Sequence, residues 1–327
     1  MQASSIFNGY IGSHLCYHLG KSGIFDLFND AEKIDIKTLT DNKNNEQKSS
    51  LFKSLIDYSL KFGLFEQDQH EKLSLTTLGK DLKKNVGFFT WAVGGYGDFI
   101  KNFTSINPDN GESFYSMVDG GDVALGSRQA NRAFMWDTVV AEFDQQDIKN
   151  IVDLGSGNAG ALINVCKVFN GVNGIGIDIS SKAIVEANEN ILNNDMQQRI
   201  TVHNQNVLDA IDDPALGEKF DQVDTVMSFM MMHDLFNAQD PVKVLRKLRT
   251  TFPNANTFFI ADTFLSDEQQ LDADTPIFSY GFEYVHHFMN IKLFNKEDYE
   301  QYFVEAGFEI TKVKYLNVPN TYLYVLK

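Results

Sequence analysis

An apolar run that ends in a glycine-rich loop constrains the fold of this chain more than any other feature. The segment IVDLGSGNAG covers residues 151–160, and Gly155 and Gly157 allow a tight turn in which the backbone can approach a ligand closely. The next apolar run, GIGIDIS, places Asp178 near its end, where a carboxylate can accept hydrogen bonds from both hydroxyls of a ribose. This pattern predicts a nucleoside-binding turn between a β-strand and an α-helix.

Strand-like and helix-like segments alternate after the start of this loop. The expected strands are residues 151–154, 174–179, 200–202, 222–229 and 257–261, and the expected helices are residues 160–169, 180–193 and 240–250. Such alternation predicts an α/β, Rossmann-like fold in which helices cover both faces of a parallel sheet. Ligands of such sheets bind at the carboxyl ends of the strands, which is where the glycine loop lies.

The part of the chain before residue 150 is expected to be mostly helical. Residues 7–28 carry Ile11, Leu15 and Leu19 at helical spacing, and residues 51–62 predict a second amphipathic helix. Residues 62–82 predict a strand, a polar turn, a second strand and a helix capped by Thr76 or Thr77. This order of elements is typical of a winged helix, whose usual role is DNA binding.

The charge of the chain argues against that role. It has 28 basic and 44 acidic residues, a net charge of −16, and no arginine before Arg128. A surface this negative repels nucleic acids and anionic membranes. We therefore interpret the first part of the chain as a packing or dimerisation module.

Composition and cysteine content limit the number of domains and the compartment to expect for this protein. A length of 327 residues suggests about two domains, and 43% hydrophobic residues exclude wholesale disorder. Cys16 and Cys166 form no paired motif, so we expect reduced thiols and no disulfide scaffold. The N-terminus shows no secretory signal, and no apolar stretch approaches the ~20 residues of a membrane span. We expect a cytoplasmic protein.

The glycine loop allows two interpretations. Residues 155–160 match GxGxxG, the fingerprint of dinucleotide-binding dehydrogenases. Asp153, however, precedes the first glycine, where its charge would crowd a pyrophosphate but would suit a cationic amine. Together, Asp153, the loop and Asp178 resemble the S-adenosylmethionine site of class I methyltransferases. The resemblance implies that the donor contacts Asp153, Gly155, Ser156, Gly157, Asp178, Ile179, Asn206, Val207 and Phe229.

The resemblance extends over nearly the whole chain. The winged-helix-like front, LTTLGKDL (residues 75–82), the glycine loop and FDQVDTVMSFMMMHDL (residues 220–235) are similar to the O-methyltransferase-like family. That family implies a seven-stranded sheet, a homodimer and an N-terminal dimerisation domain, here residues 1–125, before a methyltransferase domain, here residues 126–327. Asn206 stands where relatives often use an acid, and Ala159 replaces a loop glycine.

The segment after the fourth expected strand carries candidate catalytic residues. His233 and Asp234 lie at the carboxyl edge of the sheet, beside the expected methyl donor. In oxygen-methylating relatives a histidine here is the general base, and a histidine pKa near 6.5 suits that role. Asp234 is a second possible proton acceptor, or could orient an imidazole.

An aromatic-rich helix predicted at residues 276–294 adds His286 and His287. Neighbouring helix positions point about 100° apart, so both can reach one ion only if the helix is distorted or ends there. The combination with His233 resembles the bacterial α-keto-acid C-methyltransferases, which implies a divalent metal (Zn, Fe, Co or Ni) held by His233, His286 and His287. In that family the metal assists methylation of C3 of a 2-oxo acid through its enolate.

Residues for the acceptor are less clearly indicated. Arg128 and Arg132 lie one helical turn apart and either face the acceptor carboxylate or form a surface pair. Tyr280 and Tyr284 are expected to line an apolar pocket. The alternatives to C-methylation are a metal-independent O-methyltransferase with His233 as base, a ligand-sensing winged-helix regulator, and a nicotinamide-dependent dehydrogenase.

Overall fold

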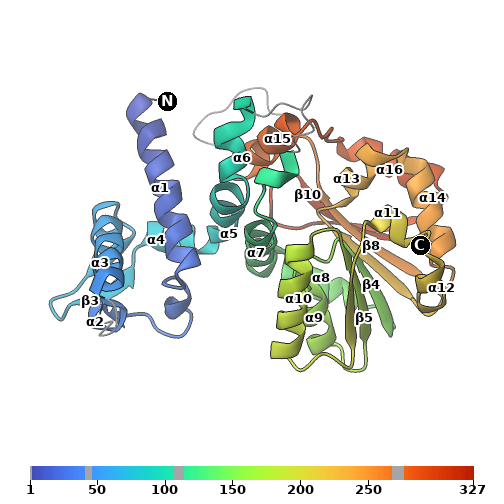
Figure 1. Cartoon of the computed structure of the whole chain (residues 1–327), viewed down its shortest axis with the longest axis horizontal. Helices are drawn as coiled ribbons and strands as arrows, with labels where there is room; N and C mark the ends of the chain where they lie inside the picture. The colour runs from blue at the N-terminus through green and yellow to red at the C-terminus, as the bar shows by residue number, and fades with distance from the viewer. Residues whose placement is uncertain (1, 41–45, 106–113, 267–275) are drawn as a thin grey trace.

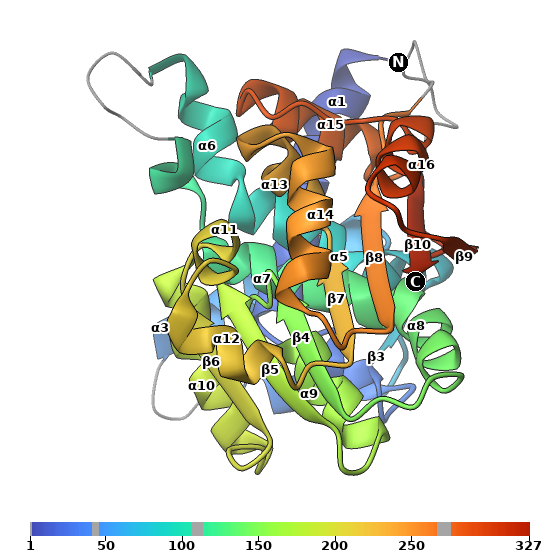
Figure 2. The same ribbon diagram turned by 90° about the vertical axis from the view of Figure 1, so that its right-hand side faces the viewer.

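A seven-stranded sheet forms the centre of the larger part of the molecule (Figures 1 and 2). The computed structural model describes residues 2–40, 46–105, 114–266 and 276–327. The sheet order is β6-β5-β4-β7-β8-β10-β9. Its strands are β4 (Asn150–Leu154), β5 (Asn173–Asp178), β6 (Ile200–Asn204), β7 (Thr225–Phe229), β8 (Thr257–Thr263), β9 (Ile310–Tyr315) and β10 (Thr321–Leu326).

The strands from β6 to β8 are parallel, and β10 runs antiparallel to both β8 and β9. This confirms the expected Rossmann-like fold class. The long apolar strand β8 is buried along its whole length, as is typical of a strand covered on both faces. After β6 the chain crosses back once and places β7 beside β4, so the carboxyl ends of β4, β5 and β7 meet at one edge of the sheet.

Helices form one layer on each face, and each layer has its own buried apolar cluster. One layer contains α11 (Val207–Ala210), α12 (Pro214–Phe220), α13 (Met232–Ala238), α14 (Pro241–Thr251) and α16 (Lys296–Glu305). The other contains α8 (Trp136–Phe143), α9 (Gly160–Val168) and α10 (Ser181–Asn193). The expected helices at 160–169, 180–193 and 240–250 are thus confirmed to within one or two residues.

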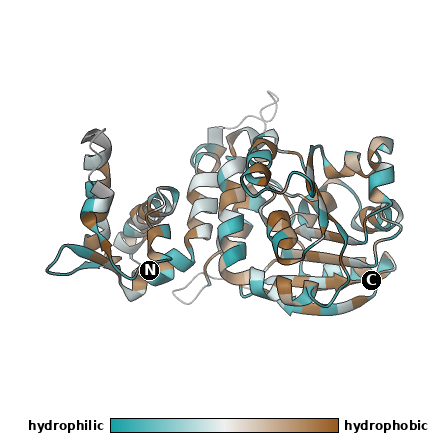
Figure 3. Cartoon of the chain, turned by 90° about the horizontal axis from the view of Figure 1, so that it is seen from below, coloured by the Kyte–Doolittle hydropathy of each residue, from teal (hydrophilic) through white to brown (hydrophobic). Residues whose placement is uncertain are grey.

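The N-terminal part has the expected order of helices and hairpin, and a third apolar cluster of its own (Figure 3). Its elements are α1 (Ala3–Lys21), η1 (Asp26–Phe28), β1 (Ile34–Asp35), α2 (Ile36–Thr40), α3 (Glu46–Lys61), β2 (Phe65–Gln67), β3 (Lys72–Leu75) and α4 (Thr77–Lys84). The hydroxyl oxygen of Thr76 accepts a hydrogen bond from Gly79 N–H (3.0 Å) and caps α4, as one of the two expected caps. Strand β1, which the sequence did not indicate, pairs with β3.

Short helices join this part to the sheet. They are α5 (Val86–Phe89), the π-helical turn η2 (Thr90–Gly95), α6 (Gly97–Asn102), η3 (Phe103–Ser105), η5 (Phe114–Met117), α7 (Gly120–Ala130) and the π-helical turn η6 (Asn131–Met135). A Cβ on Gly126 would lie 2.6 Å from the backbone nitrogen of Trp91, so α7 and η2 pack backbone against backbone. The expected domain boundary at residues 125/126 falls inside α7.

A fourth apolar cluster links these helices to α15 (Ser279–Phe288), which lies beside α6 in Figure 1. Trp91 and Phe99 from the connecting helices pack with Phe282 and Val285 of α15. The cluster fixes α15 over the carboxyl edge of the sheet. Within the described ranges, no helix is both long enough and apolar enough to span a membrane.

Candidate functional site

The main cavity lies at the carboxyl ends of β4, β5 and β7, beneath α7 and α15. Its volume is about 830 Å³. All nine predicted donor contacts line it, from Asp153 on β4 to Phe229 at the end of β7. His233, Asp234, His286 and Arg128 line the same cavity. The structure therefore brings together the residues expected to hold the methyl donor and several of those expected to act on the acceptor.

The glycine loop is held by Asp178. The two oxygens of this carboxylate accept hydrogen bonds from the N–H groups of Gly157 and Ser180, each at 2.8 Å. Gly155 and Gly157 have φ values of 80° and 52°, which glycine adopts at little cost. Ala159 stands in the place of the missing glycine with φ 60°, a left-handed conformation that costs an alanine about 1 kcal/mol.

Asp153 is a buried carboxylate without a counter-charge among the described residues. Its side chain is 3% exposed, and no hydrogen bond or ion pair to it is found in the described ranges. Burial, and then the nearby charge of Asp178, raise the pKa of Asp153 to about 8. A cationic group bound in the cavity would stabilise the carboxylate form, which matches the expectation of a bound amine.

Asn206, two residues after β6, lines the cavity and also caps a helix. Its side-chain oxygen accepts a hydrogen bond from Leu208 N–H (2.8 Å) and caps α11. Ile179 is 69% exposed at the cavity, whereas Val207 is buried. An apolar side chain and a backbone N–H thus lie where an adenine is expected, without an acidic partner from residue 206.

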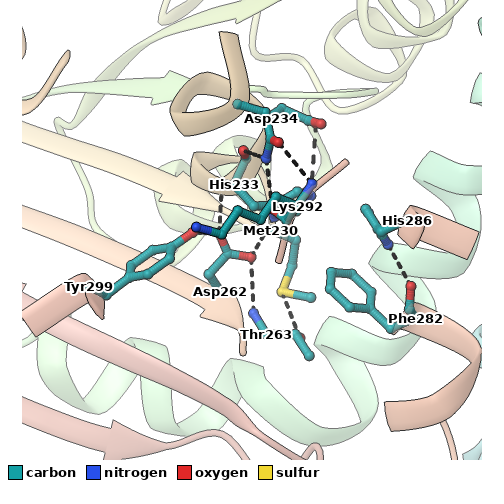
Figure 4. A network of polar contacts seen from close by, with 10 residues as sticks. Met230, His233, Asp234, Asp262, Thr263, Phe282, His286, Lys292 and Tyr299 are labelled. Atoms are coloured by element: carbon teal, nitrogen blue, oxygen red, sulfur yellow. Dashed lines mark hydrogen bonds and ion pairs between the residues drawn. The ribbon is translucent and has the colours of Figure 1, made fainter. Parts of the chain in front are cut away.

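His233 is fixed by a buried acid that sequence reasoning missed. Its Nδ1 donates a hydrogen bond to Asp262 Oδ1 (2.8 Å), and its backbone N–H donates to Asp262 Oδ2 (3.0 Å) (Figure 4). Asp262 is fully buried at the end of β8 and also accepts hydrogen bonds from Tyr299 O–H (2.7 Å) and Thr263 N–H (2.9 Å). The only available signal was an acid within the apolar strand FFIADTF.

The charges of Asp262 and Asp234 determine the pKa of His233. Burial of His233 favours its neutral form, but Asp262 and then Asp234 outweigh burial and raise the pKa of His233 to about 9. Asp234 Oδ2 lies 3.9 Å from His233 Nε2. Burial raises the pKa of Asp234, and the charge of His233 opposes that rise. The cavity therefore contains a carboxyl group beside an imidazole, both next to the donor loop.

His286 approaches His233 from α15. The two ring centroids are 4.8 Å apart, and the rings are nearly perpendicular. His286 Nδ1 donates to the carbonyl oxygen of Phe282 (2.7 Å), so its Nε2 carries the lone pair. Burial, and then the charge of His233, lower the pKa of His286 to about 3, which keeps this ring neutral.

His287 does not join these two rings. It is exposed, and it is not among the described residues that line the main cavity. Helix α15 continues through both histidines, so the 100° between neighbouring positions directs them apart, and the predicted ligand set of three histidines is reduced to two. Within the described ranges, no group of three or more His, Cys, Asp or Glu side chains is arranged to hold a metal ion. The fit to a metal is partial: two imidazoles, each oriented through Nδ1 as metal ligands usually are.

Aromatic rings form the opposite wall of the cavity. Phe278 stacks on Phe88 (4.8 Å between centroids) and meets Trp91 edge-on (5.3 Å), with Phe282 alongside. Phe278 has φ 85°, and Met230 at the end of β7 has φ 59°. Such conformations are strained for large side chains and persist where the surrounding structure enforces them, often at functional sites.

The four residues predicted to contact the acceptor do not lie together. Arg128 lines the main cavity, but Arg132 lines a second cavity beside α4, together with Lys83. Tyr280 and Tyr284 pack against each other and are not among the described residues that line the main cavity. The expected aromatic lining comes instead from Phe88, Trp91, Phe278 and Phe282.

Comparisons with known proteins agree with this geometry. A family model described as "Methyltransferase domain" matches residues 145–307. The chain is 29% identical to indolepyruvate C-methyltransferase of Streptomyces griseus over 331 aligned positions, covering 99% of this chain and 94% of the relative. It is 21% identical to a methyltransferase of Aspergillus campestris, covering 94% of this chain and 91% of that protein.

Among solved structures, human N-acetylserotonin methyltransferase in complex with S-adenosylmethionine has the same fold. The TM-score is 0.64 at 14% identity, with 99% of this chain and 96% of that chain covered. The expected donor residues line one cavity, the family model covers the sheet around it, and similar folds extend over both parts of the chain. The chain is therefore an S-adenosylmethionine-dependent methyltransferase with a methyltransferase domain at residues 145–307, and its fold is that of the O-methyltransferase-like class I enzymes that carry an N-terminal domain.

Proposed function

We propose that this methyltransferase methylates C3 of a 2-oxo carboxylic acid through its enolate, with a divalent metal ion held by His233 and His286. The convergence of these two buried imidazoles on the cavity is the observation that carries the proposal. The similarity to an indolepyruvate C-methyltransferase along the whole chain supports carbon as the methyl acceptor. When bound, a divalent ion would act as a Lewis acid toward the keto and carboxylate oxygens of the acceptor.

The protein's own residues supply the proton transfer. The C3–H bond breaks, the proton passes to the Asp234 carboxylate, and the electron pair enters the enolate. A raised pKa makes Asp234 a stronger base than an ordinary carboxylate. The enolate carbon then attacks the donor methyl group: the C–C bond forms, the S–CH₃ bond breaks and S-adenosylhomocysteine leaves. The aromatic wall excludes water and orients the acceptor.

Two measurements test carbon methylation. The purified enzyme is incubated with a panel of 2-oxo acids, and the product is examined by mass spectrometry and NMR for one added methyl group on C3. In D₂O without donor, the enzyme should also exchange the C3 protons of its acceptor. A methyl group found on oxygen would contradict the proposal.

The metal is tested on variants. Chelation should abolish activity, and addition of Zn, Fe, Co or Ni should restore it. H233A and H286A should each bind less than a tenth of the wild-type metal, since each variant loses one of the two proposed histidine ligands. H287A serves as the matched control and should bind metal as the wild type does. Full activity after exhaustive chelation would refute the metal.

The bonded pair of His233 and Asp262 favours a second candidate, a metal-independent O-methyltransferase. A histidine held at 2.8 Å by a buried acid is a common arrangement for a general base. On this alternative, His233 would remove a hydroxyl proton, and the Asp262 charge would stabilise the imidazolium. It differs from the first in three results: methyl on oxygen, no exchange at C3 and no effect of chelators.

We also propose that the enzyme is a homodimer assembled through its N-terminal part, working in a reducing compartment such as the cytoplasm. Residues 3–11 of α1 are exposed all around, and Ile6, Phe7 and Tyr10 are each more than 60% exposed. Both cysteines are buried and unpaired, as a reducing compartment permits. Sedimentation should give the mass of a dimer, and F7E should shift it toward the monomer. A wild-type monomer at high concentration would contradict this proposal.

A further inference from the structure

The second cavity lies between the N-terminal part and the connecting helices, away from the site described above. Its volume is about 850 Å³. Its polar lining includes Lys80, Lys83 and Lys84 of α4, Gln129 of α7 and Arg132 of η6. Figure 1 shows α4 on the side of α7 that faces away from the sheet. The exposed residues of α1 proposed for dimerisation are not among the described residues that line this cavity.

Four cationic side chains line the second cavity. Lys80, Lys83 and Lys84 are spaced at i, i+3 and i+4 and therefore share one face of α4. Arg132 joins them from η6. Among the described residues, none of the four forms an ion pair with a carboxylate. In a chain with a net charge of −16, four cations without an ionic partner in one cavity indicate a site for an anion.

Lys83 is held in place inside this cationic set. Its Nζ donates a hydrogen bond to the carbonyl oxygen of Phe28 (3.1 Å). Burial lowers the pKa of Lys83, the charge of Asp26 opposes this effect, and the charge of Arg132 adds to it. Lys83 and Arg132 therefore repel each other. An anion bound between them would offset the repulsion and favour the charged form of Lys83.

The same cavity also contains hydrogen-bond acceptors. Asp26, Asp30 and Glu32 line it, and none of them forms an ion pair within the described ranges. The side-chain oxygen of Gln129 is buried and has no hydrogen-bond partner in the described part of the chain. Buried acceptors are normally satisfied, so this one favours a ligand that donates from a hydroxyl or amino group. The cavity therefore suits a molecule that has both an anionic group and a donor group.

A phosphate group suits the four cations better than a carboxylate does. A phosphate monoester carries about two negative charges near neutral pH and three terminal oxygens, so several cations can share it. A carboxylate is matched by one arginine alone. We propose that the second cavity binds a small organic phosphate, with the phosphate group at Lys83 and Arg132 and a hydroxyl or amino group of the ligand at Gln129. The site is distinct from the one proposed for methyl transfer, so the proposal does not depend on which atom of the acceptor is methylated.

The test uses O-phosphoethanolamine as the probe, because it carries a phosphate and an ammonium group. Ethyl phosphate lacks the ammonium group, and β-alanine has a carboxylate in place of the phosphate. In calorimetry at low ionic strength, the wild type should bind the probe more tightly than either analogue. K83M and R132M should each weaken binding of the probe by about 10-fold or more, since each loses a charge-assisted contact. Q129L should weaken the probe about 3- to 10-fold and leave binding of ethyl phosphate unchanged.

K243M is the matched control. Lys243 is exposed on α14, which Figure 1 shows at the opposite end of the molecule from α4, so K243M should bind the probe as the wild type does. Melting curves identify any variant that fails to fold, and R132K, which keeps the charge, should lose less affinity than R132M. Saturating S-adenosylhomocysteine should leave the probe bound, because it occupies the main cavity.

Four results would contradict the proposal. Absence of probe binding to the folded wild type would refute the site, and direct competition by S-adenosylhomocysteine would assign the probe to the main cavity. Equal affinity for β-alanine would refute the preference for phosphate. Unchanged probe binding to Q129L would refute the donor contact. All four are read from binding alone, so they stand apart from any result on the methylation reaction.

Discussion

Replacing Asp262 with asparagine removes the charge that raises the pKa of His233. The carboxylate is fully buried and accepts four hydrogen bonds, two from His233 and one each from Thr263 and Tyr299. Asparagine preserves the shape of the side chain but can accept through only one of its two polar atoms. The D262N variant thus removes the charge together with two of the accepted hydrogen bonds, and of these two losses only that of the charge depends on the protonation of His233.

The size of the effect follows from the pKa of His233. A rise from 6.5 to about 9 corresponds to about 3 kcal/mol, because one pKa unit is worth roughly 1.4 kcal/mol. The pKa of His233 is higher in the folded state than in the unfolded state. Its contribution is therefore complete below pH 6.5 and is lost as the pH rises through about 9. D262N should therefore be destabilised by about 3 kcal/mol more at pH 6 than at pH 10.

Urea denaturation of wild type and D262N at pH 6 and pH 10 measures this difference. Groups such as Asp153 also titrate in this range, so the quantity to compare is the gap between the two proteins and not either curve alone. D144N, at an exposed position, is the control and should follow the wild type. A gap of the same size at both pH values would show that Asp262 acts through packing and hydrogen bonds without its charge, and would refute the reasoning.

Two further predictions concern the donor loop. Donor binding should strengthen as the pH rises through about 8, because Asp153 must lose its proton to pair with the donor ammonium; D153N should weaken binding about 10-fold and flatten this dependence, as measured by calorimetry at pH 6.5 and 9. A159G should raise the free energy of unfolding by up to about 1 kcal/mol, since φ 60° suits glycine better than alanine, and an unchanged or lower denaturation midpoint would count against this.

Much of the sheet could be predicted from the sequence because its strands are short, apolar and separated by helices of ordinary length. The donor-binding residues could be predicted as well, because the glycine loop and Asp178 each lie at the carboxyl end of a predicted strand, and the ends of neighbouring parallel strands lie close together. Strands β9 and β10 were not located individually: β9 is largely exposed at the sheet edge and lacks a continuous apolar run. Strands β9 and β10 are joined directly and not through a helix, so the alternation of strands and helices ends at β9.

The acceptor side could be predicted less well, because its residues depend on how distant segments pack. Asp262 bonds His233 across 29 positions of sequence, and Tyr299 bonds Asp262 across 37, relations that no local pattern encodes. Arg128 and Arg132 would share a face of an α-helix, but the chain enters a π-helical turn at Asn131 and the two side chains reach different cavities.

The aromatic wall has a consequence for how enzymes of this shape diversify. Phe88 and Trp91 come from the helices before the sheet, and Phe278 and Phe282 come from the segment after β8, so none of the four belongs to the strand–loop–helix units that carry the donor. Mutations in these inserted segments can alter which molecule is accepted while the machinery that delivers the methyl group is inherited intact. The acceptor specificity of such enzymes can therefore change through the aromatic wall while the donor-binding residues stay the same.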